Sequence, residues 1–349
     1  MLRLSRMIAM STRLGVSLAT LLLLGASTMV FAQDESLTVK QDAPTSYTVV
    51  KGDTLWDISA MYLDSPWLWP RLWQVNPEID NPHLIYPGDK LSLIWRNGQP
   101  VLSLKPMVKL SPKVRLLEKQ ALPTIQEGLM VPYLESDRLL EATELTASAR
   151  VLGASDSKQY LTDLQHIYVS GVHSEQKWGV YRPLSEYQRG EHKMVALKQV
   201  ATAELVGAEK TFTGLNVVSQ SQEILADDIA IPLAEEKAHT LSTVFYPTPA
   251  TAQTVASILG ALEGSQYVGQ NQVVVIDRGH DDKLRQGSMF ELYERGQQLD
   301  DDTQLPNTAI GNLMVIRPYQ FFSLALVTES SQPVSERTLL QSPLDSSTQ

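Results

Sequence analysis

The segment from Tyr47 to Trp95 constrains the fold of this chain more than any other part. It opens with a short β-prone run, YTVV, which leads into GDTL and then into a helical stretch. Thr54 and Asp57 have the spacing of a helix-capping pair, so a helix can begin between them. The helix then carries its apolar side chains on one face, at Leu55, Ile58 and Tyr62.

The second half of the segment reads SPWLWPRLWQVNPEIDNPHLIYPGDKLSLIW. Pro70 suits the first turn of a second short helix. Because the residue before a proline disfavours the helical region, that helix should end near Asn76, which precedes Pro77. Residues 90–95 alternate between apolar and polar side chains, as a half-buried strand does. The segment therefore predicts a strand, two short helices and a second strand.

This order of elements resembles the LysM domain, a small βααβ domain that binds glycans containing N-acetylglucosamine. The resemblance implies a groove between the loop after the first strand and the loop before the last one. Backbone groups at the turns would bond the acetamido group, and apolar side chains would hold its methyl group and the sugar ring. The glycan-binding residues that it implies are Gly52, Asp53, Thr54, Leu55, Asn76, Pro77, Ile79, Ile85 and Tyr86. A purely conformational role remains the alternative for these positions.

The N-terminus has the pattern of a secretory signal peptide. Arg3, Arg6 and Arg13 flank or precede an apolar run over residues 14–25, and Val-Phe-Ala before Gln33 suits cleavage. The run is short for a membrane span. We therefore expect a periplasmic protein with no stable membrane span after cleavage, and an uncleaved anchor is the alternative.

Composition narrows the classes of function. The 349 residues include no cysteine, which excludes a lipoprotein anchor, disulfides and a cysteine nucleophile. The formal net charge is −10. Without the three arginines of the signal, 26 basic residues face 39 acidic ones, and the charge falls near −13. Such an acidic chain is a poor partner for nucleic acid.

We predict an α+β chain in which a small βααβ LysM-like module precedes a β-rich region of small barrel-like or sandwich-like modules. The expected divisions are a signal peptide (1–32), a polar spacer (33–46), the LysM module (47–95), a proline-spaced linker (96–124), the β-rich region (125–330) and a flexible tail (331–349). Strands are expected at 166–171, 179–182, 201–207, 215–219, 272–277, 289–293, 310–317 and 322–328. One or two helices are expected within 125–146.

Two blocks of the β-rich region are similar to each other. The first block runs over 167–206 and the second over 275–316, at an offset of about 110 residues. Ile167 aligns with Val275 in this comparison. Duplication and convergent strand composition both explain the likeness.

The order of signal peptide, LysM module and β modules resembles a secretin-associated protein family of Gram-negative type IV pilus assembly. This resemblance implies that the C-terminal region contacts an envelope protein complex of the secretin type. Peptidoglycan glycan strands would be the partner of the LysM module.

Enzymatic interpretations find little support. The six histidines form neither HxH nor HExxH, and the sequence has no GxSxG, GxGxxG or P-loop motif. The acidic runs at 281–282 and 300–302 lack the spacing of a calcium loop and suit solvated turns. We therefore predict no catalytic residues, no metal and no cofactor.

The leading hypothesis is a non-enzymatic periplasmic protein that binds peptidoglycan and anchors an envelope assembly to it. Two alternatives stay open. A peptidoglycan hydrolase could use the LysM module for targeting, because spacing alone excludes no pair of carboxylates. A structural protein could retain a LysM module that no longer binds sugar.

Overall fold

The structure, a computed structural model, describes residues 37–73, 85–105, 122–133, 138–154, 166–233, 242–251, 254–299 and 304–343. All of these residues fall in a single unit of the chain, Leu37–Gln349. None of the helices in these ranges combines the length and the apolar character that a membrane crossing requires. The predicted signal peptide, residues 1–32, lies outside the described residues.

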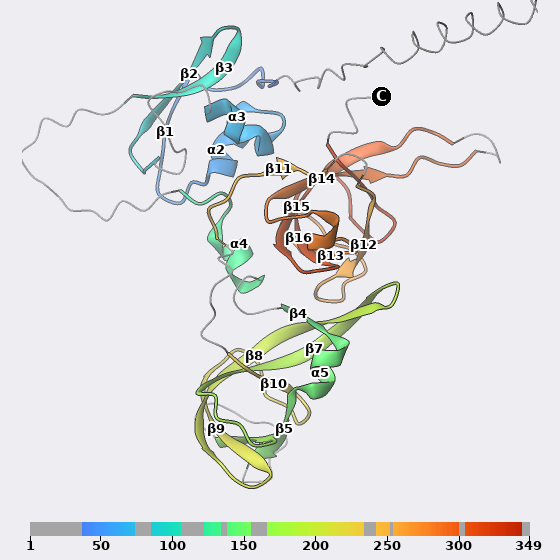
Figure 1. The fold of residues 1–349 in the computed structure, drawn as a ribbon. Coiled ribbons are helices and arrows are strands. Elements are labelled where there is room, and N and C mark those ends of the chain that lie inside the picture. Colours follow the sequence, from blue (N-terminus) through green and yellow to red (C-terminus); the bar gives the residue numbers. More distant parts are fainter. Residues whose placement is uncertain are drawn as a thin grey trace, which may run out of the picture. The chain divides into compact units, whose positions relative to one another are not determined.

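The first part of the described chain has the predicted order of strand, helix, helix and strand. Its elements are β1 (Ser46–Thr48), α2 (Leu55–Tyr62), a 3-10 turn η1 (Pro66–Leu68), α3 (Trp69–Trp73), β2 (Lys90–Arg96) and β3 (Gln99–Lys105). Strand β2 lies between β1 and β3 and pairs antiparallel with both (Figure 1). The two helices cover one face of this small sheet.

Strand β3 corrects the linker prediction, because it occupies residues 99–105 of the expected linker 96–124. Asn97 and Gly98 have φ of 53° and 79°. These left-handed values are those of the two-residue turn whose twist matches a β-hairpin. The turn therefore returns the chain along β2, and Trp95 comes to pair with Pro100.

The predicted polar spacer is also wrong where the structure describes it. Lys40 donates its backbone N–H to the carbonyl of Tyr62 at 2.9 Å, and Val39 forms an antiparallel bridge with Leu63. Apolar side chains of this stretch, including Leu37, pack against the core. Residues 37–46 thus extend the domain along the end of α2.

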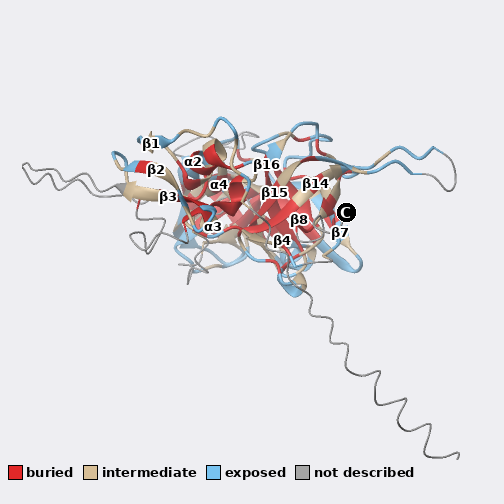
Figure 2. Cartoon of the chain, turned by 90° about the horizontal axis from the view of Figure 1, so that it is seen from above, coloured by how far each residue is buried: buried red, intermediate tan, exposed pale blue. Residues whose placement is uncertain are grey.

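Aromatic side chains supply much of this small core, as the tryptophan content predicts. Trp67, Trp69 and Trp73 are buried, together with Tyr62. Figure 2 shows much of α2 in the colour of buried residues. Burial raises the pKa of the Tyr62 phenol to about 12, which keeps it neutral. Trp95 is the contrast, because its side chain is 64% exposed near the β2–β3 turn.

The next described elements build a closed ring of strands, which we call the first ring. They are α4 (Glu127–Val131), β4 (Arg138–Glu141), α5 (Ala142–Ala147), β5 (Ala149–Ala154), β6 (His166–Ser170), β7 (Lys177–Arg189), β8 (His192–Ala208), β9 (Phe212–Gln220) and β10 (Ile229–Pro232). The pairing runs β5–β6–β9–β8–β7–β10 and returns to β5. Strand β4 pairs antiparallel with the first part of β8 and is not a member of the closed ring.

The last described elements build a second ring. They are β11 (Thr248–Pro249), β12 (Ala256–Ala261), β13 (Val273–Ile276), the 3-10 turn η4 (His280–Asp282), β14 (Ser288–Glu294), β15 (Thr308–Pro318), β16 (Ser323–Ser330) and β17 (Leu339–Gln341). The pairing runs β12–β13–β16–β15–β14–β17 and returns to β12. The C-terminal part of the molecule is therefore sheet-rich and barrel-like.

The two rings have the same strand order and share most of their register irregularities, but the shift between Pro183 and Glu186 of β7–β8 is absent from β14–β15. In the first ring, the β5–β6 pairing shifts before Gly153 pairs with Tyr168. In the second ring, the β12–β13 pairing shifts before Gly260 pairs with Val275. Both glycines have positive φ, 135° and 147°, which a bulge accepts without strain at glycine.

A buried hydroxyl repeats as well. Thr213 of β9 donates to the carbonyl of Gly171 at 2.9 Å, and Ser323 of β16 donates to that of Arg278 at 2.7 Å. The register places Ile167 opposite Ala154 and Val274 opposite Ala261. The sequence alignment of the two blocks is therefore displaced by one residue in this strand, because it pairs Ile167 with Val275.

Equivalent positions also fill the two interiors. Trp178 and Phe290 are both fully buried, as are Ile167 and Val274. Each ring has its own interior cluster of buried apolar residues. The second ring has a further buried layer on its outside, where Ile316 belongs to one cluster with the helices of the N-terminal domain.

Each predicted strand overlaps an observed one, with ends that differ by a few residues or, in β7 and β8, by more. The sequence prediction missed the short strands β4, β5, β10, β11, β12 and β17. The flexible-tail prediction for 331–349 is wrong where the structure describes it, because Val334 is buried and Leu339–Gln341 form β17. Ser342 then donates its hydroxyl to the carbonyl of Ala250 at 2.7 Å.

Candidate functional site

Thr54 begins helix α2 as the predicted cap. Its Oγ1 accepts the backbone N–H of Asp57 at 3.0 Å and donates to Oδ2 of Asp57 at 2.8 Å. Both interactions lie within the first turn, and they satisfy the hydroxyl. Thr54 and the following Leu55 are buried, at 1% and 0% exposure. The structure thus gives these two predicted groove residues a capping and a core role.

Gly52 and Asp53 form the turn before the helix. Gly52 is exposed and has φ of 100°, a value that glycine adopts easily. The Asp53 carboxylate accepts the hydroxyl of Tyr47 at 3.0 Å and the backbone N–H of Val50 at 2.8 Å. These bonds fix the turn, while the half-buried Asp53 still reaches the surface.

The other predicted side of the groove is described only in part. Ile85 is fully buried, whereas Tyr86 is half-buried and reaches the surface. The backbone N–H of Tyr86 donates to Oδ2 of Asp89 at 2.9 Å, which holds the turn before β2. The predicted groove residues Asn76, Pro77 and Ile79 lie outside the described residues.

A segment far along the chain occupies the exposed amides of helix α2. Leu55 donates its backbone N–H to the carbonyl of Pro123 at 3.1 Å, and Trp56 donates to the carbonyl of Thr124 at 3.1 Å. The first amides of a helix have no partner within the helix. The carbonyls of residues 123–124 therefore cap the N-terminal end of α2. This end of the helix carries Thr54 and Leu55, for which the sequence predicts sugar contacts.

The same segment is bonded on its other side to the connection that enters the second ring. Thr124 donates its backbone N–H to the carbonyl of Thr243 at 3.0 Å. Its hydroxyl donates to the carbonyl of Phe245 at 2.7 Å and accepts the N–H of that residue at 3.0 Å. We call residues 122–125 the latch. Sequence reasoning missed it, because the contact joins residues 121 positions apart.

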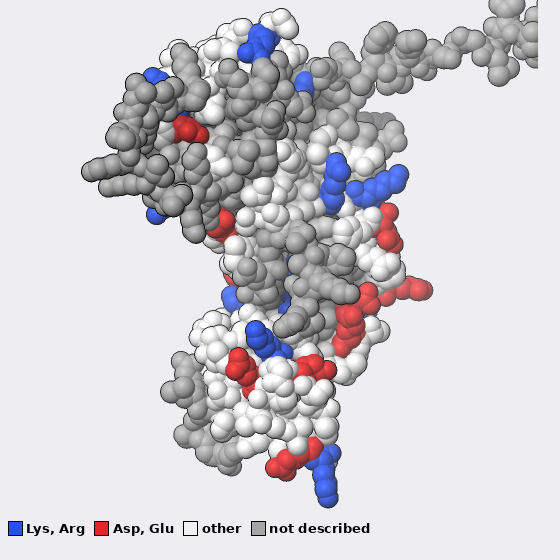
Figure 3. Space-filling model, turned by 60° about the vertical axis from the view of Figure 1, so that its left-hand side comes forward, with Lys and Arg blue, Asp and Glu red and all other residues white. Residues whose placement is uncertain are grey.

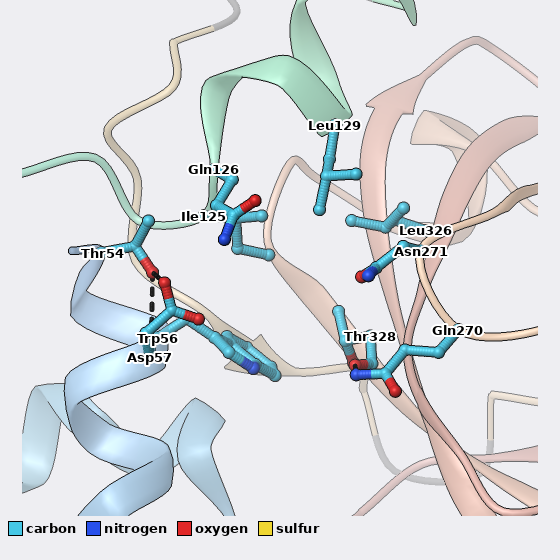
Figure 4. A pocket seen from close by; sticks show the side chains of 10 residues that line it. All are labelled: Thr54, Trp56, Asp57, Ile125, Gln126, Leu129, Gln270, Asn271, Leu326 and Thr328. Atoms are coloured by element: carbon cyan, nitrogen blue, oxygen red, sulfur yellow. Dashed lines mark hydrogen bonds between the residues drawn. The ribbon is translucent and has the colours of Figure 1, made fainter. Parts of the chain in front are cut away.

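A cleft lies beside the latch, between α2, the start of α4 and the second ring. Its volume is about 100 Å³, and its lining is Thr54, Trp56, Asp57, Ile125, Gln126, Leu129, Gln270, Asn271, Leu326 and Thr328. Figure 4 shows the Trp56 indole extending from α2 toward Gln270 and Thr328. An aromatic ring beside amide side chains is a surface that suits a polar, ring-shaped ligand.

Two carboxylates, those of Asp53 and Asp57, reach the surface at the site. Basic and acidic side chains are interspersed among uncharged ones on the face in Figure 3. Within the described ranges, no group of three or more His, Asp or Glu side chains has an arrangement that could hold a metal ion. The accessible parts of the site are therefore backbone, aromatic rings, amides and the carboxylates of Asp53 and Asp57.

Comparison with known proteins places this site in a domain type. Residues 47–93 match the model of the LysM domain. The uncharacterized protein YqbP of Bacillus subtilis (strain 168) is 38% identical over an alignment of 63 residues, and the alignment covers 15% of this chain and 29% of that protein. The chain thus spans less than a third of this relative. The sequence resemblance is confirmed for this segment, and residues 47–93 are a LysM domain, a carbohydrate-binding type of domain.

Proposed function

We propose that this chain is a non-enzymatic periplasmic protein that binds the glycan strands of peptidoglycan through its LysM domain. The observation that carries the proposal is the match of residues 47–93 to the LysM domain, together with a fold that has the strand and helix order of that domain. N-acetylglucosamine units are the ligand that this domain type implies.

The surface for the glycan is the open part of the predicted groove. Gly52, Asp53 and Tyr86 reach the surface. The turn that holds Gly52 and Asp53 lies beside the turn that holds Tyr86, because the backbone of Val49 is hydrogen-bonded to the backbones of Gly88 and Asp89. By the LysM resemblance, Asn76, Pro77 and Ile79, which lie outside the described residues, belong to the same side of the groove as Tyr86. Thr54, Leu55 and Ile85 support the groove from below.

The proposal extends to the rest of the chain. The two rings would contact an envelope assembly of the secretin type, and the LysM domain would hold that assembly at the cell wall. One shallow sugar groove binds weakly, but a repeating polymer supplies many sites and therefore avidity. Crosslinking from the ring surfaces in intact cells, followed by identification of the captured proteins, tests this part. Capture of proteins with no relation to the envelope would contradict it.

Co-sedimentation with purified peptidoglycan sacculi tests the glycan part. Removal of residues 47–95 is a poor variant, because these residues share a buried cluster with the second ring. Tyr86→Ala and Asn76→Ala should instead lower the pelleted fraction, with circular dichroism as the check on folding. Trp95→Ala is the matched control, since Trp95 is exposed in the same domain but outside the groove. Equal pelleting of all variants with the unchanged protein would refute the groove assignment.

Two further measurements separate the alternatives. Calorimetry should detect binding of N-acetylglucosamine tetramers more strongly than binding of the monomer. A purely structural LysM domain would give no heat with either. Zymography with embedded peptidoglycan should give no cleared band, and a cleared band would overturn the non-enzymatic proposal.

A further inference from the structure

The cleft beside the latch offers apolar and aromatic surface that the groove does not use. Three parts of the chain line it, which are the start of α2, residues 125–129 and the second ring. Ile125 and Leu326 are buried members of this lining, at 5% and 1% exposure. The Trp56 indole is half-buried among them. A ligand that enters the cleft therefore contacts an aromatic ring and two aliphatic side chains.

Polar groups with unused hydrogen-bonding capacity surround this surface. Within the described residues, the indole N–H of Trp56 and the side-chain amides of Gln126 and Asn271 have no hydrogen-bond partner. Figure 4 shows the amides of Gln126 and Asn271 pointing toward the same space from opposite sides. The exposed Asp57 accepts the Thr54 hydroxyl with Oδ2, which leaves Oδ1 open to the cleft. A ligand can bond these groups without breaking a bond within the protein.

The chemistry of the lining fits a neutral ring that carries hydroxyl groups. A side-chain amide donates and accepts hydrogen bonds at the same time, as a sugar hydroxyl does. Apolar and aromatic side chains with a few placed polar groups are the usual lining of a site for a small polar ligand. The described lining includes the carboxylate of Asp57 but no lysine or arginine. An anionic ligand would therefore be repelled, and a neutral saccharide is the class that fits.

Size and position connect the cleft to the groove. A volume of about 100 Å³ is below the range of about 300 to 1,000 Å³ that encloses a drug-sized ligand. The cleft can therefore hold one sugar unit or part of it, but not an oligomer. Thr54 lines the cleft and directly follows Gly52 and Asp53, which form the turn of the groove. Because successive Cα atoms lie about 3.8 Å apart, the two surfaces adjoin.

We propose that the cleft is a second saccharide subsite, which holds one unit of a glycan whose neighbouring units occupy the groove. This inference rests on the proposed glycan binding and adds contacts from outside the LysM domain. Trp56 packs against the sugar ring, and Gln126 and Asn271 bond its hydroxyls from two sides. The bonds from the latch to Leu55 and Trp56 hold the segment that carries Gln126 beside α2. The latch is then part of the structure that binds the glycan.

Magnetic resonance of the six tryptophan indoles tests the contact directly. In the isotope-labelled full-length protein, the Trp56 signal is identified by its loss in Trp56→Phe. It should shift when an N-acetylglucosamine tetramer is added, and much less with the monomer, which fills only the groove. The signal of Trp178, which is buried inside the first ring, is the control and should not shift. Equal shifts of Trp56 with monomer and tetramer would overturn the subsite.

The backbone amide of Gly52 separates failure of the subsite from failure of the proposed function, because it reports on the groove in the same protein. If Gly52 shifts with the tetramer and Trp56 does not, the subsite is refuted and glycan binding by the groove stands. If neither signal shifts, glycan binding and the subsite are both refuted.

Calorimetry on variants tests the amides. Gln126→Ala combined with Asn271→Gly removes both amides from exposed positions, and glycine accepts the φ of 66° at Asn271. Affinity for the tetramer should fall about tenfold, because two hydrogen bonds are lost, while affinity for the monomer should be unchanged. The matched control is Gln222→Ala combined with Asp227→Gly, at exposed positions of the first ring where Asp227 has φ of 68°. Tyr86→Ala in the groove should instead weaken binding of both ligands. Unchanged tetramer affinity in the cleft variant, or an equal loss in the control, would refute the subsite.

Discussion

The two rings share strand order, bulges and interior, but the outside of one is buried and the outside of the other is exposed. The clearest contrast is a cross-strand pair. In the first ring Lys177 pairs with the exposed Glu204, and in the second ring Met289 pairs with the fully buried Met314. The buried apolar residues of the interior are therefore common to both rings. The polarity of the outer residues instead depends on whether the rest of the chain packs against that face.

The same contrast appears along single strands. Strand β6 alternates, with Ile167 and Val169 inside and His166 exposed. Strand β13 is buried at every position of Val273–Ile276. A strand covered on both faces loses the alternation that one-sided burial imposes. The outer face of β13 is covered by the LysM domain, the latch and α4, whose apolar residues belong to one buried cluster with Val273 and Val275.

The largest effect should come from a charge on the outer face. Ile316→Asp should destabilise the chain by about 5 kcal/mol, because the carboxylate would be buried without a partner. Val206→Asp, at the equivalent exposed position, should change stability by less than about 0.5 kcal/mol. Urea unfolding followed by circular dichroism measures both. Similar losses for the two variants would show that the outer faces are not different environments.

Truncation inside the rings should affect both alike. Phe290→Ala and Trp178→Ala remove equivalent interior side chains, and each should cost about 3 to 5 kcal/mol through lost burial and the cavity left behind. The same unfolding experiment measures the two losses. If only one of the two variants lost this much stability, the interior of the other ring would be loosely packed.

Removal of the latch hydroxyl should have a smaller effect. Thr124→Val keeps the shape of the side chain but leaves the Phe245 carbonyl and amide without their partner, at a cost of about 1 to 3 kcal/mol. Thr124→Ser is the matched control, since it retains the hydroxyl. Hydrogen exchange should then accelerate at Leu55 and Trp56 in the valine variant, and equal exchange in both variants would show that the latch does not protect these amides.

The smallest effect concerns the charged contact between the rings, in which the Arg189 guanidinium bonds both carboxylate oxygens of Asp282. Burial by itself would raise the pKa of Asp282, but the bonds from Arg189 and from the Gly279 amide bring that pKa below its ordinary value. Arg189→Gln should cost about 1 to 2 kcal/mol at neutral pH. Because the pKa of Asp282 lies below its ordinary 3.8 in the folded chain, this contribution is complete above pH 3.8 and is lost as the pH falls through the folded pKa. The difference in the free energy of unfolding between the unchanged protein and Arg189→Gln should therefore become smaller in acid. A difference that stays constant with pH would contradict the role of the pair.

The sequence predicted most of what local patterns determine. Thr54 and Asp57 gave the cap, and the β-prone run at 166–171 gave strand β6. Short strands such as β12 and β17 escaped detection, because ring closure depends on pairing between distant segments. The unbroken run Val273–Ile276 did carry a signal of two-sided burial, but it could not show what covers the second face. In the candidate site, the turn at Gly52 followed from sequence, whereas the latch did not.

The latch also determines how far the glycan-binding domain can reach. As a free coil, the 29 residues of the predicted linker 96–124 would span on average about 30 Å and let the domain search a wide volume. Instead, β3 pairs with β2 at one end of that stretch, and Pro123 bonds Leu55 at the other. Both ends are attached to the same domain, so the stretch adds no reach. Under the proposed function, a molecule mounted in this way would meet the cell wall in one orientation, and tension on the wall would pass directly into the second ring.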